Sequence, residues 1–487
     1  MIYNTEENRA KCICPSCPSF PRTCIGELLY CSTGASKCDI EIHKCICDKC
    51  EVYIENKLGG LYFCARNITS SGKHLSRKRK NDEEISLYNK MLYIKQIAES
   101  GKSIISSMGS QKFIPFSFDQ IHFIPAQIHK IPLERDDFVN TEIIIGKSSK
   151  NPLRLSSPIM LTGMSLGAVS KNLKLVFAKT ASLLKIAFNS GEGGILDEEL
   201  DIAGSFLIGQ YCTVDNKVDL ERLNRVAAIE IRFGQGAYPG WESYLPPEKL
   251  SPEIANIRGI RGTEPIYSPA HHSDINNKAE LKAKINWIRK NTAGIPVGAK
   301  IGCGDIENDI KILASAGVDF IAIDGFGGGT GATESFVREN VGLPLIAALP
   351  RANKTLKKLG VKNRVSLIAG GGLRTSADFA KCLAMGADAV YIGTAALIAV
   401  NCDQYRVCHT GLCPTGITTH KEELTKHLVI EHGVKKLTNF IKVSTEEIAN
   451  FSRIVGKNDI NLLNIQDLVS INKELSELTG IKWLNGH

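Results

Sequence analysis

The sequence predicts an α/β protein: a (β/α)8 TIM barrel preceded by a small cysteine-rich metal or iron–sulfur module. Three observations support this prediction. Short apolar runs alternate with helical stretches from about residue 155 onward. Most of these runs end in glycine, serine or aspartate. Ten of the sixteen cysteines lie within the first 64 residues.

The apolar runs are the predicted barrel strands. Their apolar residues follow one another without strict alternation, which suits strands buried on both faces. Eight such runs in about 240 residues favour a closed barrel over an open doubly wound sheet. Helical stretches such as "IENDIKILASAG" follow several of them. The eight runs are "SPIMLTGM", "KIAFNS", "AIEIRFG", "PIYSP", "IPVGAKI", "VDFIAID", "VSLIAG" and "AVYIG".

The predicted organisation has four parts. They are a cysteine-rich module (1–65), a linker and helix (66–115), the barrel with a cysteine loop at 402–413 (116–425), and a C-terminal helical extension (426–487). The net charge of +8 is mild, and its densest patch, "KHLSRKRK", is typical of a solvated linker, so we expect no nucleic-acid partner. Neither a signal peptide nor a membrane-length apolar run is visible, which predicts a cytoplasmic protein without a membrane partner.

The N-terminal cysteines form an internal duplication. "KCICPSC" (11–17) recurs as "KCICDKC" (44–50). A segment this short has little core of its own, and in a reducing compartment its thiols indicate bound metal rather than disulfides. Zinc and an iron–sulfur cluster both suit these groups. The candidate ligands are Cys12, Cys14, Cys17, Cys45, Cys47 and Cys50.

The last two predicted strands end in glycine-rich turns, "GGGLRT" and "IGTAAL". Barrels commonly bind phosphate at this position, where backbone N–H groups can face an anion. The alternative is that these are tight turns only. A phosphate-anchored cofactor in a barrel is most often flavin mononucleotide (FMN) or pyridoxal phosphate, and Lys300, at the end of the fifth strand, could serve either. The phosphate candidates are Gly371, Gly372, Gly393 and Thr394.

Three further cysteines, Cys402, Cys408 and Cys413, lie in "CDQYRVCHTGLCPTG". Three thiolates match the three irons of a 3Fe–4S cluster, and a proline after the last cysteine is familiar in cluster-binding loops. The alternative is zinc held by the three thiols and His409. A cluster directly after the last barrel strand would be an electron inlet to a flavin.

From "FIPAQIHKIPLERDDFVNTEIIIG" to the C-terminal helices the chain resembles the FMN and iron–sulfur synthase region of glutamate synthase, in its short archaeal and bacterial form. The first 65 residues resemble a cysteine-rich domain of uncharacterised function found in archaeal proteins. The synthase motifs are "TGMSLGAVS", "NSGEGG", "SPEIANIR", "SPAHHSDI", "VGAKIGCGDIENDI", "GGGTGA", "GGLRT", "GTAAL" and "CDQYRVCHTGLCPTGI".

This resemblance implies roles for individual residues. It makes Cys402, Cys408 and Cys413 the 3Fe–4S ligands. Glu192 matches a glutamate of the catalytic pocket, and Arg258 matches an arginine that holds a carboxylate of 2-oxoglutarate. The residues implied to contact the flavin are Met164, Ser165, Gln235, Lys300, Gly371, Gly372 and Gly393.

The resemblance also implies a reaction. Electrons enter through the 3Fe–4S centre and reduce FMN, ammonia condenses with the 2-oxo acid, and flavin hydride reduces the 2-imino acid. Arg232 and Arg258 would be the cations for substrate carboxylates, Glu192 the acid/base group, and Lys300 a catalytic cation favouring the reduced flavin. A buried structural pairing is the alternative for Glu192. The electron donor would be separate, a ferredoxin or an NAD(P)H-oxidising subunit.

Three departures from the family matter. No glutaminase precedes the synthase region here, so ammonia comes from solution or from a separate glutaminase subunit. The family's "GQGAKPG" reads "GQGAYPG", which places Tyr238 where a lysine helps to bind 2-oxoglutarate, and Trp241 and Tyr244 follow it. We therefore expect a bulkier or less anionic substrate. The N-terminal cysteine module is also foreign to the well-known forms.

Two rival functions stay open. One is a flavin and iron–sulfur oxidoreductase of the same fold with a different substrate. The other is an electron-transfer subunit of a larger complex, which would need no substrate pocket.

Overall fold

A computed structural model describes residues 5–20, 27–33, 36, 43, 45–56, 63–65, 82–213, 220–258 and 264–485. The chain divides into two compact units. The first comprises Met1–Ser100 with Asp403–Tyr405, and the second comprises Gly101–Cys402 and Arg406–His487.

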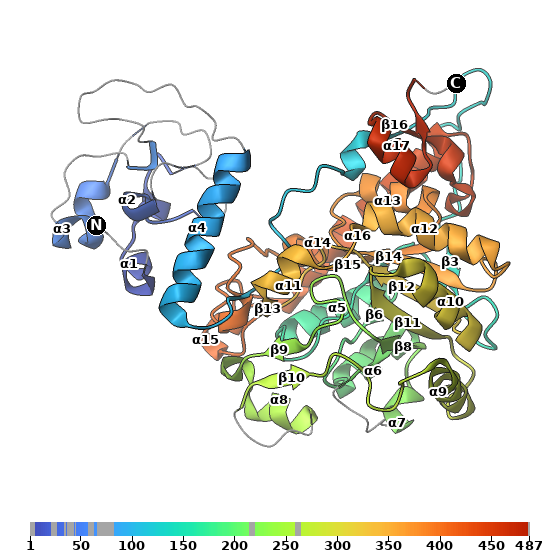
Figure 1. Ribbon diagram of the computed structural model, residues 1–487, viewed down its shortest axis with the longest axis horizontal. Coiled ribbons are helices and arrows are strands. Elements are labelled where there is room, and N and C mark those ends of the chain that lie inside the picture. The colour runs from blue at the N-terminus through green and yellow to red at the C-terminus, as the bar shows by residue number, and fades with distance from the viewer. Residues whose placement is uncertain are drawn as a thin grey trace. The chain divides into compact units, whose positions relative to one another are not determined.

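The second unit is built on a closed barrel of eight parallel strands (Figure 1). This confirms the predicted (β/α)8 fold. The strands, in order around the barrel, are β5 (Ile159–Leu161), β6 (Phe188–Asn189), β7 (Leu207–Tyr211), β8 (Ala228–Arg232), β11 (Val297–Gly302), β12 (Phe320–Asp324), β14 (Ser366–Gly370) and β15 (Ala389–Ile392).

One predicted strand is wrong and another was missed. The run "PIYSP" contains β10 (Ile266–Ser268), which pairs antiparallel with β9 (Ser243–Leu245) outside the barrel. The barrel strand in question is β7, in "LIGQY". Both are short apolar segments, and their pairing partners, which a local pattern does not contain, decide which one closes the barrel.

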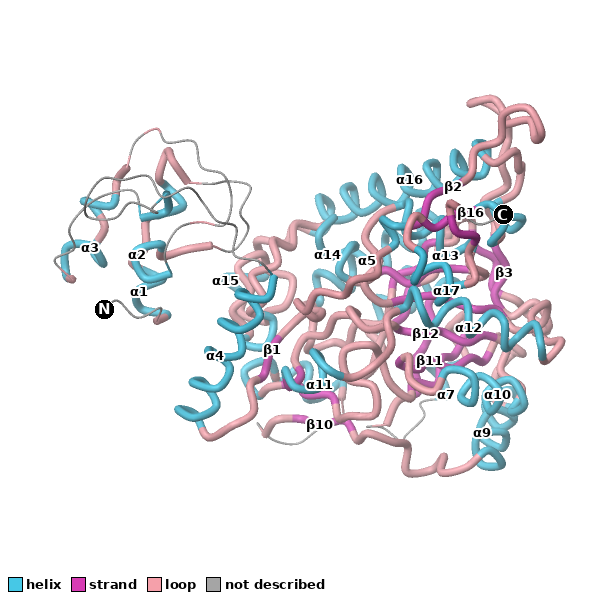
Figure 2. The backbone as a smooth tube through the Cα atoms, turned by 45° about the horizontal axis from the view of Figure 1, so that its top comes forward, coloured by secondary structure: helices cyan, strands magenta, loops and turns pink. Residues whose placement is uncertain are grey.

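Helices surround the barrel strands (Figure 2). Several begin at a side-chain cap: Ser170 accepts from the backbone of Leu173, and Thr375 from Asp378. The helices of the alternating pattern are α5 (Lys171–Leu184), α6 (Asp197–Ala203), α7 (Leu220–Leu223), α9 (Lys278–Lys290), α10 (Ile306–Ala316), α12 (Leu345–Lys358), α13 (Ser376–Ala384) and α14 (Thr394–Ala399). The long helix α16 (Ile430–Ile454) packs on α5 and α13.

Smaller elements complete the second unit. Strand β1 (Ile105–Ser106) pairs with β13 (Thr333–Glu334), and β16 (Leu468–Ser470) lies between β2 (Ile121–Phe123) and β17 (Lys482–Trp483). The remaining helices are α8 (Pro252–Ile257), α11 (Ser335–Asn340), α15 (Glu422–Thr425) and α17 (Lys473–Thr479).

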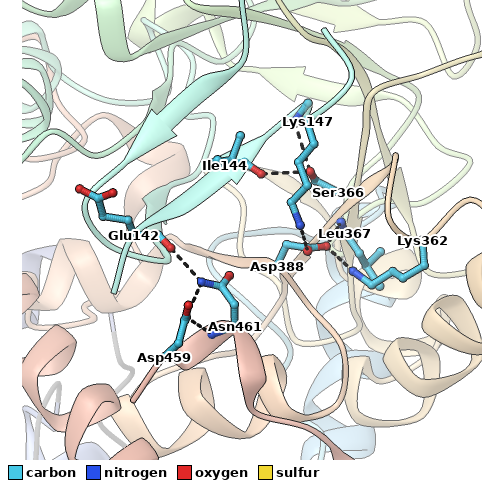
Figure 3. Close-up of polar contacts among 10 residues, drawn as sticks. Glu142, Ile144, Lys147, Lys362, Ser366, Leu367, Asp388, Asp459 and Asn461 are labelled. Carbon is cyan, nitrogen blue, oxygen red and sulfur yellow. Dashed lines mark hydrogen bonds and ion pairs between the residues drawn. The ribbon is translucent and has the colours of Figure 1, made fainter. Parts of the chain in front are cut away.

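Polar contacts fasten the barrel where β14 and β15 begin (Figure 3). Asp388 accepts hydrogen bonds from the backbone of Leu367 (2.7 Å) and from Lys362, and it pairs with Lys147 at 3.4 Å. Lys147 follows β3 (Ile143–Ile145), which pairs with β4 (Leu153–Leu155). This end, where the strands start, is therefore tied down, and the opposite end carries the polar side chains described below.

The first unit contains four short helical elements that repeat the sequence duplication and one longer helix. The 3-10 turns Cys14–Ser16 and Cys47–Lys49 occupy equivalent positions in the two repeats. Its helices are α1 (Glu6–Ala10), α2 (Tyr30–Thr33), α3 (Glu51–Glu55) and α4 (Asp82–Ser100). The basic stretch 73–80 and two of the cysteines, Cys24 and Cys38, lie outside the described residues. Among the helices that are described, none has the length and apolar character needed to cross a membrane.

Candidate functional site

A cavity with about 1290 Å³ of unfilled space, part of it open to solvent, lies at the carboxyl end of the barrel strands. This is where barrel active sites lie. It brings together most of the predicted site residues of the barrel. Those that line it are Met164, Ser165, Glu192, Arg232, Gln235, Tyr238, Lys300, Gly371, Gly372, Gly393, Thr394 and Cys408.

The charged residues of the barrel strands are aligned by register. Arg232 on β8 and Lys300 on β11 are direct neighbours, and Glu230 shares the Arg232 face because side chains alternate along a strand. Lys300 Nζ lies 3.0 Å from Thr162 Oγ1 and 3.4 Å from Asp324. Glu230 accepts hydrogen bonds from Asn189 and Gln210. Two buried cations therefore stand side by side.

The opposite part of the cavity is lined by backbone. A side chain at Gly371 (φ +104°) would place its Cβ 2.4 Å from the nitrogen of Gly325, and one at Gly393 would meet Thr162 at 3.0 Å. Arg374, directly after these glycines, also lines the cavity. Burial lowers the pKa of Arg374, with Asp378 opposing this. Narrow glycine-lined backbone beside a cation suits a phosphate group.

Glu192 is the centre of a charged cluster. Its carboxylate accepts hydrogen bonds from Arg232 and from Ser268 Oγ (2.6 Å). Ser243 Oγ lies 3.4 Å away, and Arg258 Nη1 lies 3.9 Å away. Burial alone would raise the pKa of Glu192, but Arg232 and Arg258 outweigh it, so the pKa lies below its ordinary value. Glu192 is therefore ionised and paired in this state.

Arg258 lies behind Glu192 and does not line the cavity itself. Its Nε donates to the carbonyl of Leu166 at 3.1 Å. Among the described residues, its two terminal nitrogens have no hydrogen-bond partner. A Cβ at Gly193 would lie 2.4 Å from the Arg258 guanidinium carbon. Glycine is thus required here for the guanidinium to lie against the backbone.

Three aromatic residues that follow β8 take different positions. Tyr238 lines the cavity, and its hydroxyl accepts from Arg232 Nη1 at 3.2 Å. Tyr244 lines it as well. Trp241 does not: it is 41% exposed, and its indole donates to Glu334 at 3.0 Å. The expectation that Trp241 restricts the substrate is therefore not supported, whereas Tyr238 is at the cavity.

In the cysteine loop, Cys408 and Cys413 are both buried, and Cys402 packs against the barrel core. Burial raises the pKa of Cys408, although Lys249 opposes it. Burial also acts to raise that of Cys413, but hydrogen bonds from Thr415 and Thr418 outweigh it and lower the pKa. Hydroxyl donors and a nearby ammonium favour thiolates, which metal binding requires.

Lys249 is a fully buried lysine that sequence reasoning missed. Its Nζ donates to the carbonyls of Ala168 (2.5 Å) and Cys408 (3.0 Å), and it lines the cavity. Burial lowers its pKa to about 8, with Cys408 and Cys413 opposing this. It therefore connects the cavity with the cysteine loop.

The zinc alternative places His409 among the ligands. His409 instead meets Ser107: Nδ1 lies 2.7 Å from Ser107 Oγ, and the His409 backbone donates to the same oxygen at 2.9 Å. Across the described part of the chain, no three thiol, imidazole or carboxylate groups stand in an arrangement that could hold a single metal ion. The N-terminal candidates Cys12, Cys14, Cys17, Cys45, Cys47 and Cys50 line a separate cavity in the first unit.

Comparison with known proteins identifies the family. A model of the conserved region in glutamate synthase matches residues 87–458. The chain belongs to the glutamate synthase family. Residues 12–65 match a second model, described only as a protein of unknown function (DUF2769).

Glutamate synthase relatives cover most of this chain. The archaeal glutamate synthase [NADPH] of Methanocaldococcus jannaschii is 35% identical over 82% of this chain and 84% of its own length. A glutamate synthase large subunit-like protein of Rhizobium meliloti is 34% identical over 81% and 94%. A soluble mutant of (S)-mandelate dehydrogenase from Pseudomonas putida aligns with a TM-score of 0.49 at 16% identity, over 72% of this chain and 88% of that one. The prediction of an oxidoreductase of the glutamate synthase type is confirmed by these family relationships.

Within this glutamate synthase fold, several cavity residues carried a weak sequence signal or none. Glu230 interrupts the apolar strand "AIEIR", and Arg374 directly follows the glycines of "GGGLR". Those positions could have indicated the site. Lys249 sits in an ordinary polar turn, so only the structure reveals its burial.

The pairing of Glu192 makes stability depend on pH. Its folded pKa lies below the ordinary 4.5, so Glu192 stabilises the fold above about pH 4.5 and loses this effect as the pH falls through the folded value. We expect Glu192→Gln to lower the urea midpoint at pH 7, and the difference from the wild type to shrink below about pH 4. Exposed Glu242→Gln is the matched control. A difference independent of pH would contradict this assignment.

Proposed function

We propose that this glutamate synthase family member forms an amino acid by reductive amination of a 2-oxo acid, 2-oxoglutarate or a close relative. Ammonia comes from solution or from a separate glutaminase subunit, and electrons come from a separate ferredoxin or NAD(P)H-oxidising subunit. The observation that carries the proposal is the single cavity in which Glu192, Arg232 and Lys300 face a glycine-lined anion site.

The lining residues fit FMN. Gly371, Gly372, Gly393, Thr394 and Arg374 would hold its phosphate, because a Cβ at two of these glycines would enter space that the backbone already occupies or borders. Lys300 would place its charge beside the ring system, together with Met164, Ser165 and Gln235. When bound, FMN supplies the hydride for reducing the imino acid.

The arginines would bind the substrate carboxylates. Arg232 Nε and the terminal nitrogens of Arg258 are buried donors without a hydrogen-bond partner among the described residues, and such donors are costly to leave unsatisfied. In the present state the Glu192 carboxylate occupies Arg232. A substrate carboxylate would compete for the same guanidinium.

This competition gives Glu192 its proton-transfer role. Once displaced from Arg232, Glu192 stays buried but loses its strongest opposite charge, and its pKa rises. It would then hold a proton at a carboxylate oxygen close to the substrate. Pairing in the free state and acid/base action in the bound state are therefore successive states of one residue.

The cysteine loop fits a 3Fe–4S cluster held by Cys402, Cys408 and Cys413. Thr415 and Thr418 hydroxyls reach the Cys413 thiol, and Lys249 supplies a positive charge beside Cys408. An anionic cluster requires such donors. The cluster would pass electrons to the flavin.

The first test is an anaerobic assay of the purified protein loaded with FMN. Chemical reductant, 2-oxoglutarate and ammonium are supplied, and glutamate is measured by mass spectrometry. Turnover with ammonium supports a stand-alone synthase. A protein that holds FMN and the cluster, yet aminates no 2-oxo acid even with a glutaminase subunit present, contradicts the proposal.

The second candidate, a changed substrate, is favoured by Tyr238. We expect Tyr238→Lys to raise kcat/KM for 2-oxoglutarate about tenfold, because a charged donor replaces a neutral one beside Arg232. Tyr238→Phe keeps the ring without the charge and should show no gain. Equal 2-oxoglutarate kinetics in both variants would argue against a role of this position in specificity.

A further inference from the structure

The first unit contains a cavity lined by eight cysteines and by apolar or aromatic side chains, with about 480 Å³ of unfilled space. Two of these thiols, Cys31 and Cys64, were not among the predicted ligands. They lie 33 residues apart, the same spacing that relates Cys12 to Cys45, Cys14 to Cys47 and Cys17 to Cys50. The duplication therefore supplies four thiols from each repeat.

The fold of the two repeats follows this relationship. The backbone of Cys17 donates to Cys14 at 2.9 Å, and that of Cys50 donates to Cys47 at 3.0 Å. The ring pair Phe20–Tyr30 of the first repeat corresponds to Tyr53–Phe63 of the second, and both centroid distances are 6.2 Å. The repeats are therefore structural equivalents, and contacts seen in one indicate those of the other.

Contacts across the repeats show which thiols belong together. Buried Cys50, from the second repeat, forms a small core against which Cys12 and Cys31 of the first repeat pack. Its thiol lies 3.6 Å from the carbonyl of Lys11, the residue before Cys12. Burial raises the pKa of Cys31, and nearby Cys12 and Cys50 add to this. The last cysteine of one CxCxxC group thus sits with the other repeat.

The remaining contacts complete the pattern. The Cys12 and Cys14 side chains hydrogen-bond each other. In the second repeat, Cys47 interacts with Cys45 and Cys64. Applying the repeat equivalence to Cys50 places Cys17 with this second group.

We propose that the first unit binds two 4Fe–4S clusters, each held by three cysteines of one repeat and one of the other. The first set is Cys12, Cys14, Cys31 and Cys50; the second is Cys45, Cys47, Cys64 and Cys17. Four thiolates are the ligands that a 4Fe–4S cluster takes, and thiols that surround an apolar space suit a polynuclear cluster. This inference goes beyond the reaction proposed for the barrel and does not depend on it.

Double variants of the full-length protein test the exchange. Iron and acid-labile sulfide are measured after anaerobic reconstitution, with FMN content as a check on the barrel. Cys31→Ser with Cys50→Ala removes two ligands of one set, so about four irons per chain should be lost relative to the wild type. Cys64→Ser with Cys50→Ala affects both sets, so about eight should be lost.

The alternatives give different counts. Sets confined to single repeats would reverse the two losses, and equal losses in both variants would show that the sites are not two independent sets. Either result overturns the proposal. So does a wild-type protein in which zinc, rather than iron with sulfide, accompanies these thiols. Cys382→Ala, at a buried barrel cysteine, is the control and should lose no iron.

Discussion

Arg232→Met is expected to lower kcat/KM for the 2-oxo acid by at least about thirtyfold. Truncating one partner of a buried, hydrogen-bonded charge pair costs about 2–5 kcal/mol, and each 1.4 kcal/mol is a factor of ten. Arg232 is the cation that pairs with Glu192 and borders Lys300 in the register of β8 and β11. Its loss removes a carboxylate ligand and also leaves Glu192 with only the more distant Arg258.

The same variant should unfold more easily. Breaking a buried pair by removing one partner costs roughly 3–5 kcal/mol, because the other charge remains buried. Urea unfolding measures this, and kinetics with saturating ammonium measure turnover. Arg232→Lys, which retains the charge, should recover part of both. Arg225→Met removes an exposed arginine paired with Asp201 and should change neither. Full turnover in Arg232→Met would show that the substrate is held elsewhere.

Lys249→Met is expected to lower the reduction potential of the barrel's iron–sulfur cluster. Reduction adds negative charge beside Cys408 and Cys413, and the buried Lys249 ammonium stabilises that charge. We expect the ratio of reduced to oxidised cluster at a fixed ambient potential to fall about tenfold, which corresponds to 59 mV for one electron. Redox titration followed by electron paramagnetic resonance gives this ratio without any turnover.

A matched control separates charge at the cluster from the general loss of a buried lysine. Lys381 is also buried, and its ammonium donates to the carbonyl of Phe118 at 2.8 Å, but it does not line the cavity. Lys381→Met should leave the cluster potential unchanged. An unchanged potential in Lys249→Met would rule out this electrostatic role, and the two carbonyls would then be its only partners of importance.

Much of the fold could be predicted because buried parallel strands are written as local apolar runs. Seven of the eight predicted runs contain barrel strands. The exception, "PIYSP", has the same composition as a strand but meets β9 instead of the barrel. Strand pairing is a long-range choice, and burial of both faces of β7 depends on helices distant in sequence.

The candidate site was predictable to the extent that its residues stand in motifs at strand ends. Glu192, Lys300 and the glycines after β14 and β15 meet in one cavity because the barrel places all carboxyl ends at one face. Lys249 and the exposure of Trp241 were not predictable. Both depend on how the segment after β8 folds back over the barrel, which no local pattern describes.

The equivalence of the two cysteine repeats bears on how such a module can originate. With each four-thiol set shared between repeats, one repeat by itself could hold no complete set, whereas two identical copies related by a twofold axis could hold two. Joining the copies in one chain replaces an encounter between subunits with an intramolecular one. It also frees the halves to diverge, as Pro15 and Asp48, or Phe20 and Tyr53, have done. The module is thus a dimer within a single chain.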